Sequence, residues 1–333
     1  MQLVVAFLFR SLSLTVGACM LTPNVTQSLI RGIDRILIHT QDVERVFGRF
    51  RHEFGLSVAW PIADCGLLVS GGLYAGNMTI EIGRFAGFAL PGTWLYGVGL
   101  APSQPTWETV NGLVSRKVLH APPVTVHYEE PIATRSTLTF LRNLLDGQPN
   151  TPFWLGRPWG GDTRVCRALA ALSTWMVGTA AGSMTFAKLL GSSAVFICDN
   201  EIDRHQERLA ELRANWKRTR QNGPYGITGI AAVDIEVAAN TACWGRLLDR
   251  PDLTTNYIHS FSMGPPLRFH PGGSNRLLGI EFSCADLESI AQQLIEKRWL
   301  VPTDAKRITL PPGRMDGLTI GFSQSPTTGT EKH

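Results

Sequence analysis

An arginine and a histidine that could bind and deprotonate a small molecule lie on one short apolar segment. Arg35, Leu37 and His39 are two residues apart in a β-rich run over residues 33–40, so a strand would place all three on one face. A guanidinium group matches a carboxylate or enolate oxygen, and an imidazole transfers protons near neutral pH. Glu81, in a later β-rich run, adds a carboxylate that could pair with Arg35 or act as a base.

Several other kinds of site are excluded by the sequence. It contains no GxSxG, no phosphate-binding loop, no HExxH and no GxGxxG that follows a strand. The six cysteines are scattered without a CxxC pair, which gives no zinc-ligand spacing and favours a reduced compartment. The formal net charge is only +4 and no concentrated basic face is present, so nucleic acid is not an expected partner.

The elements that would position these residues form one βαβββ unit. After the strand at 33–40, apolar residues recur with helical spacing over 43–50. Asp42 is a suitable N-cap for that helix, and Gly55 is a suitable stop. Three short strands follow at 57–60, 65–70 and 78–82, the last two joined through Gly71-Gly72 and Gly76-Asn77, which suit tight turns.

The same order of elements then recurs along the chain, which is the signature of a repeat architecture. The second unit has strands at 94–100, 124–128, 138–144 and 194–198, with a helix at 107–118. The third has a strand at 227–237, a helix at 241–248 and a poorly defined pair of strands up to residue 269. The fourth has strands at 278–283, 307–310 and 318–322, with a helix at 286–297.

These units predict two domains joined by a linker. A first domain spans residues 31–203 and a second spans 226–325, with a tail at 326–333. A charged helix over 204–220 runs into Gln221-Asn222-Gly223-Pro224 and makes 204–225 a natural linker. Residues 1–30 form a leader without an acidic residue. It leaves mitochondrial targeting or secretion open beside the cytoplasmic location that the cysteines favour.

An insert at about 147–191 interrupts the second unit. Its uncharged stretch at 168–186 is long enough to span a bilayer, but its Gly, Ala, Ser and Thr content makes it only weakly hydrophobic. A buried insert, a contact in a homodimer or a lid is the preferred interpretation, and a membrane is not an expected partner. Retained non-coding sequence is the remaining alternative.

The opening segment and two later segments carry a resemblance to a known family. Residues 33–38, 42–44 and 71–81 resemble the first module of vicinal oxygen chelate (glyoxalase-like) proteins. Residues 224–230 are similar to the start of a second such domain, and 282–288 to the strand-to-helix junction of its last unit. The resemblance implies an α+β fold in which tandem βαβββ units form open, U-shaped mixed β-sheets around a cavity, with helices packed outside.

The resemblance also implies where a metal would sit and why it is not expected here. In metal-dependent members, four strand positions, typically two His and two Glu, hold a divalent cation. Matched by motif, those positions fall at Arg35, Glu81, Tyr96 and Asp199. An arginine cannot lose its proton to become a ligand, and its charge repels a cation. We therefore expect no metal and no other cofactor, and Arg35, Tyr96 and Asp199 become candidate substrate-binding residues.

When the same family positions are matched to the second domain, they fall on fewer residues that could bind or react with a ligand. Its matching positions, Ile230, Gly279 and Gly321, can neither ligate a metal nor transfer a proton. His259 and His270 lie in a stretch rich in Gly and Pro, where they are expected to be surface or core residues.

Together these observations predict an enzyme of the lyase or isomerase type that acts on a small or mid-sized organic molecule without a metal. Proton transfer next to a carbonyl is the expected reaction, with Glu81 or His39 as the base and Arg35 binding the oxyanion. Alternatively, Arg35 and Glu81 form a structural ion pair. Rival functions are a protein that sequesters its ligand unchanged, a metal-dependent ring-cleaving dioxygenase, and a scaffold assembled through the insert.

Overall fold

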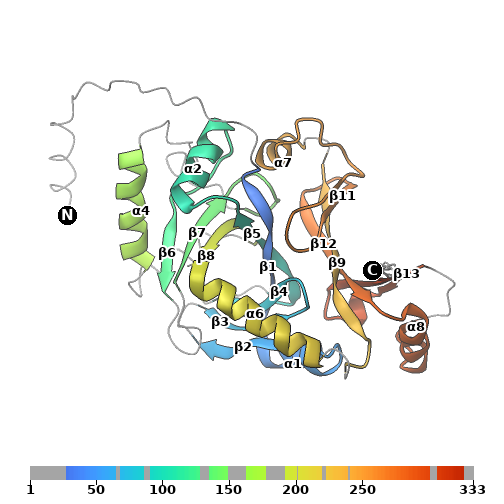
Figure 1. Ribbon diagram of the computed structural model, residues 1–333. Helices are drawn as coiled ribbons and strands as arrows, with labels where there is room; N and C mark the ends of the chain where they lie inside the picture. Colours follow the sequence, from blue (N-terminus) through green and yellow to red (C-terminus); the bar gives the residue numbers. More distant parts are fainter. Residues whose placement is uncertain are drawn as a thin grey trace, which may run out of the picture.

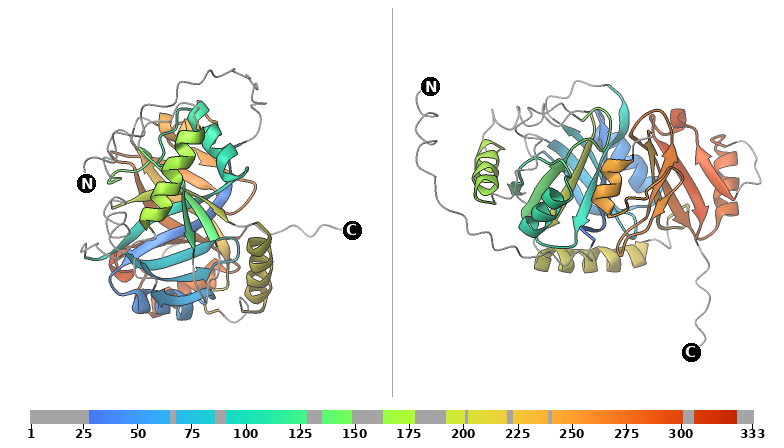
Figure 2. Two further views of the ribbon diagram at one scale, coloured as in Figure 1. Left: turned by 90° about the vertical axis from the view of Figure 1, so that its left-hand side faces the viewer. Right: turned by 90° about the horizontal axis from the view of Figure 1, so that it is seen from above.

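The computed structural model describes residues 28–64, 68–85, 91–127, 135–148, 163–177, 192–200, 202–219, 223–238, 241–300 and 306–325. Within them the chain forms two curved β-sheets, one from each half of the sequence, which lie side by side (Figures 1 and 2).

The first sheet has eight strands and is built from two units of the expected βαβββ order. Its elements are β1 (Ile30–Thr40), α1 (Val43–His52), β2 (Ser57–Asp64), β3 (Leu68–Tyr74), β4 (Thr79–Phe85), β5 (Thr93–Pro102), α2 (Thr106–Ser115), β6 (Val124–His127), β7 (Arg135–Leu141) and β8 (Ala194–Asn200). The strand order is β2-β3-β4-β1-β5-β8-β7-β6. The first strand of each unit pairs in parallel with the last, β1 with β4 and β5 with β8, and β1 meets β5 in antiparallel fashion at the centre.

The second sheet repeats this plan with one strand fewer per unit in the part of the chain that the structure describes. Its elements are β9 (Ile227–Val237), α7 (Ala242–Leu248), β10 (Ile258–His259), β11 (Leu267–Pro271), β12 (Arg276–Cys284), α8 (Leu287–Glu296), β13 (Arg307–Leu310), η2 (Pro312–Arg314) and β14 (Thr319–Gln324). Six strands lie in the order β10-β11-β9-β12-β14-β13. Again the central pair, β9 and β12, is antiparallel and each central strand has a parallel neighbour.

Alternation along the central strands separates a helix-covered face from a concave face. On β1, Ile36 and Ile38 belong to the main core beneath the helices, together with Val98 of β5. Leu37, between these two isoleucines on β1, and Tyr96 on β5 belong to a second and smaller cluster on the opposite face. The expected α+β architecture, with open mixed sheets and helices outside, is confirmed (Figure 2).

An aromatic cluster joins the two halves into one core. Phe54, just after α1, packs against three rings of the second half. The ring centroids are 5.6 Å apart to Tyr225, 5.7 Å to Phe282 and 5.9 Å to Phe322. Because buried aromatic rings contribute large apolar areas, this contact fixes how the two sheets face one another.

The start and end of α1 follow the sequence signals. The Asp42 side chain accepts a hydrogen bond from the backbone N–H of Arg45, as an N-cap does. Gly55 has a φ of 71°, a left-handed conformation that glycine adopts without strain, and the chain turns there into β2. Both expectations for this helix are confirmed.

Gly71 and Gly72 do not form the expected turn but lie inside β3. A Cβ atom at Gly72 would collide with the indole ring of Trp60, and one at Gly71 would lie 2.6 Å from the ring of Phe47. Glycine is required here because side chains from β2 and α1 cover both faces of the strand. The turn before β4 is confirmed at Gly76, which has a φ of 87°.

Substitution of Gly72 by alanine should therefore destabilise the fold by about 1–3 kcal/mol, since the new methyl group overpacks against Trp60. Gly273→Ala is the matched control, because a Cβ atom there would meet no atom within 4 Å. Chemical denaturation of both variants measures the effect. Equal stability of the two would show that β3 and β2 separate easily at this point.

Two further helices pack at the edges of the first sheet. α4 (Thr163–Val177) lies within the predicted insert and runs beside β6. Residues 149–162 and 178–191 of the insert, which include the uncharged stretch beyond Val177, lie outside the described residues. α6 (Ile202–Thr219) confirms the predicted charged helix and packs near β2. Among the described residues, no helix is long and apolar enough to cross a membrane.

Candidate functional site

The first cluster of charged side chains lies on the concave face of the first sheet. The Arg35 Nε atom donates to Asp34 Oδ2 at 2.7 Å, and Arg35 Nη1 donates to Glu81 Oε2 at 3.2 Å. Asp34 and Arg35 are neighbours in sequence, but the pairing of β1 with β5 is irregular between Ile33 and Arg35, which allows both to lie on one side. The predicted ion pair between Arg35 and Glu81 is present.

Two residues of β8 complete this cluster. The Cys198 Sγ atom lies 3.7 Å from Arg35 Nη2 and 3.3 Å from Asn200 Oδ1, and Asn200 Nδ2 donates to Asp34 Oδ1 at 3.3 Å. Burial raises the pKa of the Cys198 thiol to about 12, because the thiolate would lose its hydration. The thiol therefore stays protonated and is not a nucleophile at neutral pH.

His39 and Tyr96 are enclosed rather than open to a ligand. The His39 side chain is fully buried, its ring centroid lies 4.3 Å from that of Trp94 with the planes tilted by 37°, and one ring nitrogen lies 3.4 Å from Gln41 Nε2. Tyr96 is 1% exposed, and burial raises the pKa of its hydroxyl well above the usual range. Both residues lie on the predicted strands, but neither reaches solvent.

Asp199 does not join Arg35, Glu81 and Tyr96 in one site. Along β8 it alternates with Cys198 and Asn200 and so points to the opposite face of the sheet. There its Oδ2 atom accepts hydrogen bonds from the backbone nitrogen and the hydroxyl of Thr106, at 2.8 and 2.5 Å, and fixes the start of α2. The prediction that Asp199 belongs to the same site was wrong, because a shift of one residue along a strand moves a side chain to the other face of the sheet.

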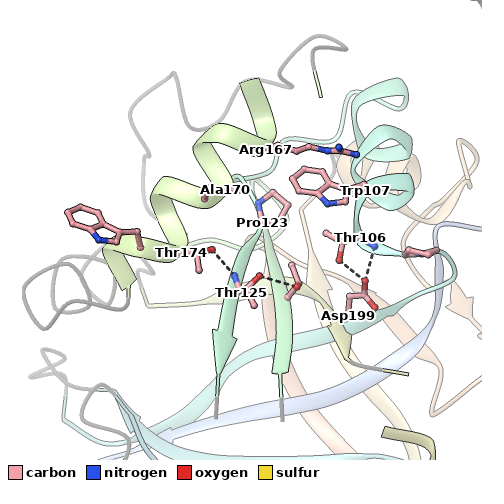
Figure 3. A pocket seen from close by; sticks show the side chains of 12 residues that line it. Thr106, Trp107, Pro123, Thr125, Arg167, Ala170, Thr174 and Asp199 are labelled. Atoms are coloured by element: carbon pink, nitrogen blue, oxygen red, sulfur yellow. Dashed lines mark hydrogen bonds between the residues drawn. The ribbon is translucent and has the colours of Figure 1, made fainter. Parts of the chain in front are cut away.

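Asp199 instead lines a separate pocket of about 670 Å³ between α2, α4 and the strands β6 and β7 (Figure 3). The Arg167 guanidinium lies over the Trp107 ring, 5.2 Å from its centroid. The hydroxyl of Thr174 accepts from the backbone nitrogen of Thr125 at 3.1 Å and ties α4 to β6. These two contacts connect α4 to α2 and to β6.

A second cluster, which the sequence analysis did not anticipate, lies on the concave face of the second sheet. Arg268 Nη1 lies 2.9 Å from Glu281 Oε2 and 3.3 Å from Asp234 Oδ1. Arg307 Nη2 lies 2.8 Å from Asp234 Oδ2, and its Nε donates to Glu281. The two carboxylates are buried, whereas the side chains of Arg268 and Arg307 are 21% and 41% exposed.

His270 belongs to the same cluster. Its Nε2 atom lies 2.7 Å from Asp234 Oδ1, and the side chain is 31% exposed. An ionised carboxylate only accepts hydrogen bonds, so Nε2 carries the proton and, in the neutral ring, Nδ1 keeps a lone pair. The ring is thus oriented by a buried carboxylate and is open to a ligand, which neither Glu81 nor His39 is.

The expectation that the second half offers less chemistry than the first overlooked this cluster. It rested on Ile230, Gly279 and Gly321, whereas the ionisable residues lie at other positions of the same sheet. The signal was in the sequence. Arg268 and His270 are two residues apart in β11, so they share a face, and Leu267 and Phe269, which alternate with them, are buried in the core.

Glu281 makes the free energy of unfolding depend on pH. Burial opposes ionisation, but the hydrogen bond from Arg268 and the charges of Arg268 and Arg307 outweigh it, so the pKa lies below its ordinary value of 4.5. A lowered pKa in the folded state stabilises the protein above the ordinary value, and this contribution is lost as the pH falls through the folded value. Unfolding free energies measured from neutral pH to well below 4.5 should fall less steeply, in the range below 4.5, for Glu281→Gln than for the wild type. An identical slope would contradict this role.

Known structures share the fold of this chain. The homoprotocatechuate 2,3-dioxygenase of Arthrobacter globiformis superposes with a TM-score of 0.50 at 9% identity, covering 93% of this chain and 84% of that one. The 2,3-dioxygenase LapB of Pseudomonas sp. KL28 gives 0.48 at 9% identity over 91% and 96% of the two chains. The Mn(II)-bound glyoxalase of Novosphingobium aromaticivorans gives 0.47 at 9% identity over 90% and 83%. The chain has the vicinal oxygen chelate fold. No protein-family model matches the sequence, and no curated protein matches it at a significant level.

The vicinal oxygen chelate fold implies a divalent metal in some members, but the residues present here do not fit one. On both concave faces the buried carboxylates already accept hydrogen bonds from guanidinium groups, whose charge would repel a cation. Within the described ranges, no group of three or more His, Cys, Asp or Glu side chains is placed to hold a metal ion. The groups available to a ligand on these faces are therefore the hydrogen-bond donors and the proton acceptors of the side chains themselves.

Proposed function

We propose that this protein is a metal-independent lyase or isomerase that moves a proton next to a carbonyl of a small or mid-sized organic molecule. The acid–base residue is His270, on the concave face of the second sheet. The observation that supports this is the contact of 2.7 Å between His270 Nε2 and the buried Asp234 carboxylate, with two arginines beside it. A carboxylate that fixes the tautomer and orientation of a histidine is a general feature of acid–base sites.

The chemistry follows from the groups at the site. His270 Nδ1 takes the proton from the carbon next to the carbonyl, and the electron pair of that C–H bond moves onto the carbonyl oxygen. The developing enolate accepts hydrogen bonds from guanidinium N–H groups of Arg268 or Arg307, which are fixed in place before the reaction. In an isomerisation, the proton returns from His270 to the opposite face of that carbon as the carbonyl re-forms. In an elimination, the enolate electrons re-form the carbonyl, the C–H electron pair becomes the new C=C bond, the leaving group departs from the neighbouring carbon, and the proton on His270 passes to that group or to water.

Exposure favours this site over the one that the sequence predicts. The Glu81 side chain is 7% exposed and pairs with Arg35, which also pairs with Asp34. A ligand would have to displace a buried ion pair there, and breaking such a pair leaves an uncompensated charge. On the second sheet, His270 and Arg307 already reach solvent while their partners stay buried.

The first test is deuterium exchange in the wild type. A panel of small keto acids, hydroxy acids and thioesters is incubated with the protein in D₂O, and NMR follows exchange of the hydrogens next to the carbonyl. Faster exchange than in buffer, for any member of the panel, supports the enzyme. Tight binding of a compound without exchange would support the sequestering function instead.

A further inference from the structure

Each concave face brings two buried carboxylates to one guanidinium group. In the first half, Arg35 lies between Asp34 of β1 and Glu81 of β4, at 2.7 and 3.2 Å. In the second half, Arg268 of β11 lies between Asp234 of β9 and Glu281 of β12, at 3.3 and 2.9 Å. The two arginines come from strands that are not equivalent, yet the resulting arrangement of charges is the same.

Two converging carboxylates in a buried place need a neutralising partner, which can be a metal ion, a guanidinium or a shared proton. Around Arg35 the neighbouring atoms are two carboxylate oxygens and the Cys198 sulfur, 3.7 Å from Nη2. Around Arg268 they are two carboxylate oxygens, and His270 also bonds one of these carboxylates. Oxygen, nitrogen and sulfur donors of this kind are the ones that bind transition metals.

We propose that these arginines act as built-in cations that occupy the place of a divalent metal and so keep both concave faces free of one. This goes beyond the proposed reaction, because it states what sets the chemistry available on each face. A ligand oxygen is then held by N–H donors instead of by coordination. The residue that decides this in the first half is Arg35, since it is the arginine that contacts both Asp34 and Glu81 within the described residues.

Removal of Arg35 should let Asp34, Glu81 and Cys198 close around a metal ion, which these three side chains are not placed to hold while the guanidinium lies between them. Arg35→Leu leaves Asp34, Glu81 and Cys198 without their cation. The variant is titrated with Co²⁺ and followed by calorimetry and by the visible absorption of the ion. We expect saturable binding at least about 100-fold tighter than any binding by the wild type, with a sulfur-to-metal charge-transfer band from Cys198. That band should be lost in Arg35→Leu/Cys198→Ala.

The second half supplies an internal control. Arg268→Leu alone should not bind Co²⁺ more tightly than the wild type, because Arg307 still contacts both Asp234 and Glu281. The double variant Arg268→Leu/Arg307→Leu should gain a site, without the sulfur band. The single and double variants differ by one arginine that is 41% exposed, so they separate charge from general loss of packing.

If Arg35→Leu does not fold alone, it is refolded with and without Co²⁺, and recovery of far-UV circular dichroism only with the ion supports the proposal. The proposal is overturned if the wild type itself binds Co²⁺ as tightly as the variants. It is equally overturned if folded Arg35→Leu and the folded double variant gain no binding, or if Co²⁺ fails to rescue an unfolded Arg35→Leu.

Discussion

Replacing His270 by glutamine should lower the rate of hydrogen–deuterium exchange next to a carbonyl by about 100-fold or more, the range expected for loss of a general base. Glutamine keeps a polar group near Asp234 but cannot take up a proton. Binding of the same compound should stay within about threefold, because the arginines that would hold its oxygen remain. The measurement is the exchange rate by NMR for whichever panel compound the wild type turns over.

Glu81→Gln is the decisive comparison for this result. The sequence predicts Glu81 or His39 as the base, whereas the geometry favours His270. If Glu81→Gln loses exchange and His270→Gln retains it, the reaction takes place on the first sheet and the proposed site is wrong. Loss in His270→Gln alone supports the second sheet.

The second large effect concerns stability. Asp234→Asn should destabilise the protein by about 2–4 kcal/mol, because it leaves Arg268, Arg307 and His270 facing a single buried carboxylate, Glu281. The figure is below that for a fully buried pair because the arginines are partly exposed and water screens their charge. Denaturant unfolding followed by fluorescence measures it.

Asp249→Asn is the matched control for that substitution. Asp249 is 49% exposed, lies 3.6 Å from Arg116 and has a φ of 57°, a conformation that asparagine tolerates. Its loss should cost less than about 0.5 kcal/mol. Equal effects of the two substitutions would mean that the cluster on the second sheet contributes no more than a surface ion pair.

Much of the fold could be predicted because its signals are local. The recurring strand and helix periods gave the order of the elements, and Asp42 and Gly55 marked the ends of α1. Strand edges were less certain. β2 and β3 extend several residues past their predicted ends, since pairing with neighbours and not the residue types decides where a strand stops.

The site was harder to predict because it depends on strand register. The Arg35–Glu81 pair was correct, since both residues lie on strands whose faces were assigned correctly. Asp199 was assigned to the wrong face, because one residue of shift reverses every side chain of β8. Asp234 and Glu281 were overlooked because matching to family positions pointed to neighbouring glycines, and β11 had no clear limits in the sequence.

The most direct test of a metal-independent site is elemental analysis of protein purified without chelators, with native mass spectrometry on the same sample. The account predicts less than one tenth of a divalent metal ion per chain, because guanidinium groups already neutralise the carboxylates on both concave faces. A stoichiometric divalent metal would contradict it. Metal-assisted chemistry would then replace proton transfer by His270 as the leading hypothesis.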